Sequence, residues 1–158
     1  MTKATYNNEV IWIIGASSGI GAALAKELSA RGARLALSAR RKEMLETLKQ
    51  SLGVEHKIFA LDVTDAELVG RTAQAIRAAF GRIDRVIFLA AAYTPMKFDN
   101  FDLALTRQMI EVNLLGAFYT VDAALLIFKE QQKGQIALCG SVAGYSPFGC
   151  CIEPTPDA

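Results

Sequence analysis

The sequence predicts a three-layer α/β/α fold, in which a doubly wound parallel β-sheet lies between two layers of helices. Two observations predict it: short apolar segments alternate with longer segments of helical periodicity, and the apolar segments are almost continuously hydrophobic. Strands that alternate with helices form βαβ units, and their parallel strands are buried on both faces. With 158 residues, 52% of them hydrophobic, the chain can form one domain with a substantial core.

Five short apolar segments are expected to form the strands, because they are rich in β-branched and large apolar residues. In chain order they cover residues 9–14 (EVIWII), 34–38 (RLALS), 57–61 (KIFAL), 85–90 (RVIFLA) and 135–140 (QIALCG). Trp12 in the first segment is expected in the core. Cys139 in the last is expected to pack as a small hydrophobic residue.

The segments between these strands carry apolar residues at helical spacing. In chain order the expected helices cover residues 19–31, 42–52, about 64–80 and 101–132, the last as one long helix or a pair. Gly32, Gly53 and Gly81 follow the first three helices as C-terminal stops, and Thr64 or Asp65 can cap the third. Residues 149–158 break the pattern, with two prolines that disfavour an ordered element. The sequence therefore predicts a domain over residues 1–148 and an irregular tail over 149–158.

Composition and charge exclude several kinds of partner. Lys and Arg number 17 against 16 Asp and Glu, and the basic residues are scattered, so no nucleic-acid surface is expected. No apolar stretch reaches the roughly 20 residues that span a bilayer, and no secretory signal is evident, so no membrane partner is expected. The three cysteines lack metal-type spacing, which predicts no metal site and a reduced, cytoplasmic protein. His56 has no neighbouring candidate ligands and is expected at the surface.

The segment Gly15-Ala16-Ser17-Ser18-Gly19-Ile20-Gly21 lies between the first expected strand and the first expected helix. A bound pyrophosphate needs a tight turn, a close approach of the backbone, and a helix N-terminus directed at the phosphates. Glycines provide the first two, the helix provides the third, and the two serines add hydroxyl donors. The glycines could instead form only a tight turn, but the strand–turn–helix context favours nucleotide binding.

The glycine spacing, Gly-x-x-x-Gly-x-Gly, resembles that of the short-chain dehydrogenase/reductase family, and the resemblance covers residues 9 to about 145. It implies a Rossmann fold with a nicotinamide dinucleotide at the glycine turn. It also implies an oxidoreductase that transfers hydride between this cofactor and a small-molecule carbonyl or secondary alcohol.

Arg40 and Arg41 follow the second expected strand, and no Asp or Glu lies between residues 34 and 42. An acidic residue here would bind the ribose 2′-hydroxyl of NAD, whereas a basic residue can pair with the 2′-phosphate of NADP. Similarity to family members with this pattern implies that the cofactor is NADP(H) rather than NAD(H). It also implies that Arg40, together with Arg41, binds the 2′-phosphate. The alternative is that both arginines only form the solvated start of a helix.

Two further segments match family positions that border the cofactor. Asp62-Val63 matches the pair beside the adenine ring, although an Asp before Thr-Asp fits helix capping equally well. Residues 88–91 (FLAA) occupy the place of the family's Asn-Asn-Ala-Gly segment. Only the small Ala90 is retained, and it still permits a close approach of the cofactor.

Catalysis in this family depends on a tyrosine, a lysine, a serine and an asparagine, which together protonate and stabilise a developing alkoxide. The resemblance assigns the asparagine to Asn113 in VNLLGAF and the serine to Ser141 in GSVAG. A hydrogen bond to the backbone is the alternative role of Asn113, and an ordinary strand-end serine is that of Ser141. The family's Tyr-x-x-x-Lys should follow about a dozen residues later, but residues 153–155 read EPT and no lysine follows Lys133.

This departure predicts a chain truncated or frame-shifted before the motif, with an incomplete NADP-binding domain, the C-terminal strands missing and catalysis impaired. The alternative function is a non-catalytic dinucleotide-binding module or a partner subunit. The fifth strand would then be an open sheet edge beside an apolar helix over residues 112–128. Such surfaces favour self-association, so a homo-oligomer is expected.

Overall fold

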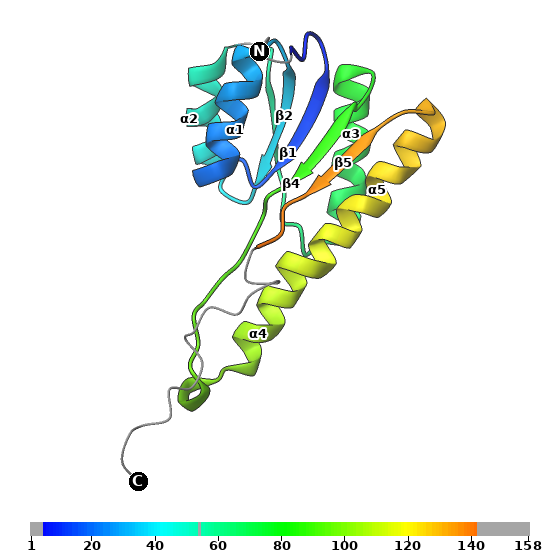
Figure 1. Ribbon diagram of the computed structural model, residues 1–158. Helices are drawn as coiled ribbons and strands as arrows, with labels where there is room; N and C mark the ends of the chain where they lie inside the picture. The colour runs from blue at the N-terminus through cyan, green and yellow to red at the C-terminus, as the bar shows by residue number, and fades with distance from the viewer. Residues whose placement is uncertain (1–4, 54, 142–158) are drawn as a thin grey trace.

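The computed structural model describes residues 5–53 and 55–141 and confirms the α/β/α architecture (Figure 1). Five parallel strands form one sheet in the order β3-β2-β1-β4-β5. They are β1 (Val10–Ile14), β2 (Arg34–Ala39), β3 (Lys57–Ala60), β4 (Arg85–Phe88) and β5 (Gln135–Leu138). The strand order reverses at β1, which makes the sheet doubly wound. The predicted boundary at residue 148 lies outside the described residues.

Helices cover both faces of the sheet, as the alternating sequence pattern predicts. One face carries α1 (Gly19–Ala30) and α2 (Lys42–Leu52), and the other carries α3 (Ala66–Phe80) and α5 (Gly116–Gln131) (Figure 1). Between β4 and α5 lie the 3-10 turn η1 (Phe98–Asn100), the helix α4 (Leu103–Ile110) and the π-helical turn η2 (Glu111–Leu115). The elements α4, η2 and α5 follow one another without a gap. The expected long helix or pair of helices is therefore a single long helix that contains a π-helical turn.

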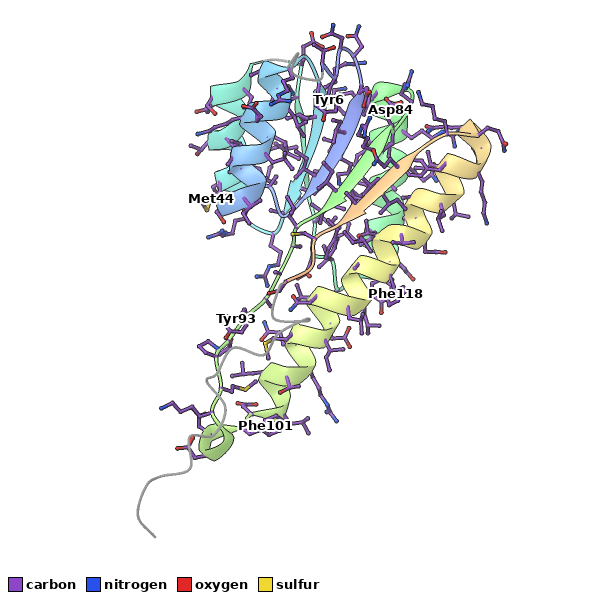
Figure 2. All side chains as sticks on the ribbon, viewed as in Figure 1. Tyr6, Met44, Asp84, Tyr93, Phe101 and Phe118 are labelled. Atoms are coloured by element: carbon purple, nitrogen blue, oxygen red, sulfur yellow. The ribbon has the colours of Figure 1, made fainter. Side chains whose placement is uncertain are left out.

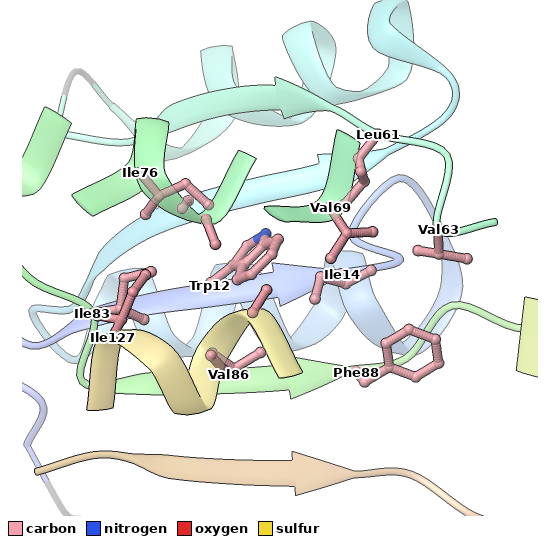
Figure 3. Packing of buried hydrophobic residues seen from close by; sticks show 14 of the residues in the cluster. Trp12, Ile14, Leu61, Val63, Val69, Ile76, Ile83, Val86, Phe88 and Ile127 are labelled. Atoms are coloured by element: carbon pink, nitrogen blue, oxygen red, sulfur yellow. The ribbon is translucent and has the colours of Figure 1, made fainter. Parts of the chain in front are cut away.

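The central strand β1 divides its side chains between two cores, because successive residues of a strand point to opposite faces. Trp12 packs with residues of α3 and α5 (Figure 3), whereas Ile11 and Ile13 pack with residues of α1 and α2. In register, Trp12 lies between Ala36 of β2 and Val86 of β4. All three β1 side chains are 0% exposed, so the expectation of a core tryptophan is confirmed.

Two side chains lie elsewhere than the sequence predicts. His56, expected at the surface, is only 4% exposed. Its Nδ1 accepts the backbone N–H of Leu35 at 3.1 Å, and its Nε2 lies 2.8 Å from Oγ of Ser29. The polar turn around His56 folds back between α1 and β2, which a local pattern does not reveal. Cys139 is exposed rather than packed, because β5 is an edge strand and ends at Leu138.

The continuous helix from α4 to α5 extends beyond the sheet, and Tyr93 and Phe101 lie on the segment that accompanies it (Figures 1 and 2). By length and composition alone, Leu103–Gln131 could cross a membrane, and 33% of its most apolar window is buried inside the fold. Its α5 part contributes Ile127 to the core formed with α3 and the sheet. On its outer face, Phe118 is 61% exposed (Figure 2).

Candidate functional site

A cavity of about 660 Å³ opens at the carboxyl ends of the strands. Every strand contributes a residue at or just after its end, namely Ile14, Ala39, Leu61, Phe88 and Cys139. Ile14 and Phe88 are seen at this end of the sheet in Figure 3. Doubly wound sheets bind ligands at this edge, where the strand order reverses, and the volume is typical of ligand pockets.

The cavity brings together ten of the twelve site residues selected from the sequence. These are Gly15, Ser17, Ser18, Ile20, Gly21, Arg40, Val63, Ala90, Asn113 and Ser141. The other two, Gly19 and Asp62, are not among the residues that line it. Gly19 lies within the glycine turn and is the first residue of α1. Six segments distant in the sequence thus meet at one edge of the sheet.

Glycine is required at two positions of the turn by close packing. Gly15 has φ of 93°, in the left-handed region, and a Cβ on it would lie 2.6 Å from the backbone nitrogen of Ala90. A Cβ on Gly21 would overlap the carbonyl oxygen of Gly15. The missing side chains let the turn lie directly on the end of β4, and they let α1 begin directly on the turn.

The N-terminus of α1 is available to a negatively charged group. Its N-cap, Ser18, makes no side-chain capping hydrogen bond, and the first turn contains no acidic residue. The first backbone N–H groups of a helix have no partner within the helix, and the helix dipole gives this end a partial positive charge. The arrangement is that of an anion site at a helix N-terminus.

Two arginines follow β2 and line the same cavity. Arg41 donates hydrogen bonds from its guanidinium to Oγ of Ser17 at 3.3 Å and to Oγ of Ser18 at 3.1 Å. Arg40 is exposed. Neither Asp nor Glu occurs among the cavity-lining residues in the part of the chain that the structure describes. This end of the cavity is therefore positively charged.

Asp62 and Val63, a pair in the sequence, have different surroundings. Oδ1 of Asp62 accepts the backbone N–H of Thr64 at 3.1 Å and its hydroxyl at 2.8 Å. These bonds correspond to the capping alternative, and Asp65 then caps α3 by accepting the N–H of Leu68 at 2.9 Å. Val63 is only 5% exposed and lines the cavity.

Asn113 lies in the π turn η2 and is hydrogen-bonded to the chain that leaves β4. Its Oδ1 accepts the backbone N–H of Ala92 at 2.7 Å, and its Nδ2 donates to the carbonyl oxygen of Ala92 at 2.8 Å. These two bonds correspond to the alternative role expected for Asn113, a hydrogen bond to the backbone. The same residue also lines the cavity. Ser141 lines the cavity just after β5 and is exposed. Residues 153–155, the position at which the family's Tyr-x-x-x-Lys motif is expected, lie outside the described residues.

The cavity also has apolar lining residues that the sequence reasoning did not select. Leu61, Phe88 and Val112 line it. Their positions in the sequence could have identified them as lining residues, because Leu61 and Phe88 lie at the ends of strands and Val112 precedes Asn113. Over residues 5–53 and 55–141, no group of three or more His, Cys, Asp or Glu side chains could hold a metal ion.

A family model described as short chain dehydrogenase matches residues 9–152. This chain belongs to the short-chain dehydrogenase family. The match confirms the resemblance and the Rossmann fold expected from the glycine turn. Members of this family are oxidoreductases, and their fold implies a nicotinamide dinucleotide as cofactor.

The curated relatives of this family member include staphylococcal proteins named as uncharacterized oxidoreductases. It is 33% identical over 144 residues to one from Staphylococcus epidermidis, covering 91% of this chain and 63% of that protein. It is 37% identical over 143 residues to one from Staphylococcus saprophyticus, covering 89% and 58%. The chain therefore spans less than two thirds of the length of these relatives.

Solved structures of the family have the same fold. A serine dehydrogenase from Escherichia coli matches with a TM-score of 0.82 and 26% identity, over 88% of this chain and 65% of that chain. A short-chain dehydrogenase/reductase from Mycobacterium ulcerans matches with a TM-score of 0.87 and 22% identity, over 92% and 55%. The low identities make these likenesses evidence for the fold alone.

Proposed function

We propose that this chain binds NADP(H) in the cavity at the carboxyl edge of the sheet. We further propose that the protein is an oxidoreductase acting on a small-molecule carbonyl or secondary alcohol. One observation carries the cofactor assignment: Arg40 and Arg41 line the cavity after β2, and no carboxylate occurs among its described lining residues. A 2′-phosphate pairs with such arginines, whereas a free ribose 2′-hydroxyl is usually bound by an acidic residue at this place.

The residues of the glycine turn fit a dinucleotide. Gly15 and Gly21 keep the turn free of side chains, and the N-terminus of α1 offers unpaired N–H groups to the pyrophosphate. Ser17 and Ser18 add hydroxyl donors beside it. When bound, the nicotinamide ring supplies or accepts the hydride, and the chain's own residues bind and orient it.

The two arginines are proposed to share the recognition of the 2′-phosphate. Arg41 already donates to both serine hydroxyls, so its guanidinium stands beside the glycine turn. Arg40 lines the cavity and its side chain is exposed, so it is accessible to the phosphate. Charge-assisted hydrogen bonds from both side chains would favour NADP(H).

The proposed roles at the other end of the cavity concern the substrate. The Ser141 hydroxyl would donate to the substrate carbonyl oxygen and stabilise charge that develops there. Asn113, through its two bonds to Ala92, would hold the π turn against the end of β4. Val63 and Ala90 would border the cofactor from the wall of the cavity.

A second candidate function is dinucleotide binding without turnover, alone or as a partner subunit. The lining residues that the structure describes offer serine hydroxyls but neither a phenol nor an ammonium group as a proton donor. We also propose that the protein forms a homo-oligomer, because large apolar side chains on α5 are exposed. An exposed thiol at Cys139 suits the reducing cytoplasm.

Calorimetric titration with NADP⁺ and NAD⁺ tests the cofactor assignment. The unmutated chain should prefer NADP⁺ by about 10–100-fold, since a charged hydrogen bond contributes about 1.5–3 kcal/mol. Arg40→Asp should remove or reverse this preference, because it replaces the attraction by repulsion. Arg71→Asp is the matched control, since Arg71 is exposed on α3 and does not line the cavity. Equal affinities in the unmutated chain would refute the role of Arg40.

A further inference from the structure

Two walls of the cavity meet at Gly116, the first residue of α5. One wall follows β3 and includes Val63, and the other is the π turn η2, which includes Val112 and Asn113. A Cβ built on Gly116 would lie 2.8 Å from Cγ2 of Val63 and 3.0 Å from its Cβ. Real Cβ atoms do not approach carbon atoms so closely, so an alanine here would force one wall to move.

The helix is held on both sides of Gly116. Before it, the side chain of Asn113 makes two hydrogen bonds to Ala92, at 2.7 and 2.8 Å. After it, Ala124 and Ile127 of α5 are 0% exposed in the core formed with α3 and the sheet. The helix therefore cannot retreat without breaking these contacts. Val63 lines the cavity, so a displacement of its side chain would change the cavity wall.

The strand order indicates which half of a dinucleotide this contact would affect. Val63 follows β3, and β3 lies next to β2, which leads into Arg40. Ser141 follows β5 at the opposite edge of the sheet. If Arg40 reads the 2′-phosphate, then Val63 lies on the adenosine side of the cavity and away from Ser141.

We propose that Gly116 is a positioning residue for the cofactor, whose missing side chain keeps Val63 in the wall and holds the adenosine end of the cavity open. The proposal rests on the proposed binding of NADP(H). It assigns to Gly116, which is buried and does not line the cavity, an effect on affinity that passes through Val63.

The test is calorimetric titration of Gly116→Ala with NADP⁺ and with adenosine 2′,5′-bisphosphate, which has no nicotinamide. Both ligands should bind about tenfold more weakly, because the ligand must push back the displaced Val63 against an overpacked contact. The matched control is Gly70→Ala, the same change inside α3, where a Cβ would meet nothing within 4 Å. It should leave both affinities unchanged.

A compensating variant separates this role from a general loss of stability. A Val63→Ala background removes Cγ2 at 2.8 Å, and the contacts that remain, with Cβ at 3.0 Å and the backbone oxygen at 3.2 Å, need a shift of only a few tenths of an ångström. In this background Gly116→Ala should cost about threefold or less, against about tenfold in the unmutated chain. Equal losses in both backgrounds, or unchanged affinity for the bisphosphate in the single variant, would overturn the proposal. If the single variant does not fold, the double variant should fold and bind within about threefold of Val63→Ala. Failure of the double variant to fold would overturn the proposal. If the unmutated chain bound neither ligand, the proposed function itself would be wrong, and this inference with it.

Discussion

Replacing the buried His56 by alanine is expected to lower the free energy of unfolding by about 2–4 kcal/mol. The backbone N–H of Leu35 donates to Nδ1 of His56, so in the folded protein this nitrogen carries no proton. The neutral ring then donates from Nε2 to Oγ of Ser29, whose hydroxyl donates to the carbonyl oxygen of Leu52. One imidazole therefore joins β2, α1 and the end of α2.

The magnitude follows from the groups that the substitution leaves without partners. Leu35 is 0% exposed, and a buried N–H without an acceptor costs about 1–3 kcal/mol. The hydroxyl of Ser29 loses one hydrogen bond, which contributes about 0.5–1.5 kcal/mol. For a domain of this size, each kcal/mol corresponds to about 2–4 °C in Tm, so Tm should fall by roughly 5–15 °C.

Urea unfolding at several pH values is the assay, because the same contacts make stability depend on pH. Burial lowers the pKa of His56 below its ordinary value of 6.5, and the nearby Lys49 adds to this, while a hydrogen bond with Leu52 and the charge of Glu55 oppose it. The unfolded chain takes up a proton near pH 6.5, whereas the folded chain does not. The free energy of unfolding should therefore fall as the pH drops below about 6.5 toward the folded-state pKa.

His56→Ala should remove this part of the pH dependence, and Ser29→Ala is the matched control. The control keeps the bond between Leu35 and His56 and should cost only about 1 kcal/mol. An unchanged urea midpoint in His56→Ala would refute the structural role of the imidazole. The same slope of stability against pH between 5 and 7, with and without His56, would refute the assignment of the lowered pKa.

Other predictions concern the glycine turn and the exposed helix. Gly21→Ala should destabilise the domain by about 1–3 kcal/mol in urea unfolding, because its Cβ would overlap the carbonyl oxygen of Gly15; an unchanged midpoint would contradict this. Phe118 and Leu126 are 61% and 54% exposed, so the double change to serine should reduce self-association without lowering Tm by more than about 2 °C. Light scattering that shows a monomer before the change would contradict the proposed role of this surface.

Much of the fold follows from the sequence because local patterns carry it. The apolar runs around Trp12 and Val86 predict strands buried on both faces, and Gly32 and Gly81 end helices through their backbone freedom. The glycine turn is equally local, since its spacing between a strand and a helix is enough to predict where a phosphate would bind.

Other features depend on residues far apart in the chain. The sequence was enough to select Asn113 as a site residue. Its two hydrogen bonds to the backbone of Ala92 form only because the fold places η2 beside the end of β4. The sequence favoured Arg40 over Arg41 as the residue that binds the 2′-phosphate. In the structure it is Arg41 that contacts the serines of the turn. Side-chain direction at the start of a helix depends on packing, which the local sequence does not specify.

The sequence by itself determined the strands, the helices, the glycine turn and the family, because hydrophobic period and backbone freedom are properties of short segments. Only the tertiary structure decided that His56 is buried and that Gly116 lies against Val63. The reason is physical: burial and contact depend on which segments the strand order brings together, and paired residues of neighbouring strands in this sheet lie between 21 (Ala36 and Lys57) and 74 (Ile11 and Arg85) positions apart in the chain.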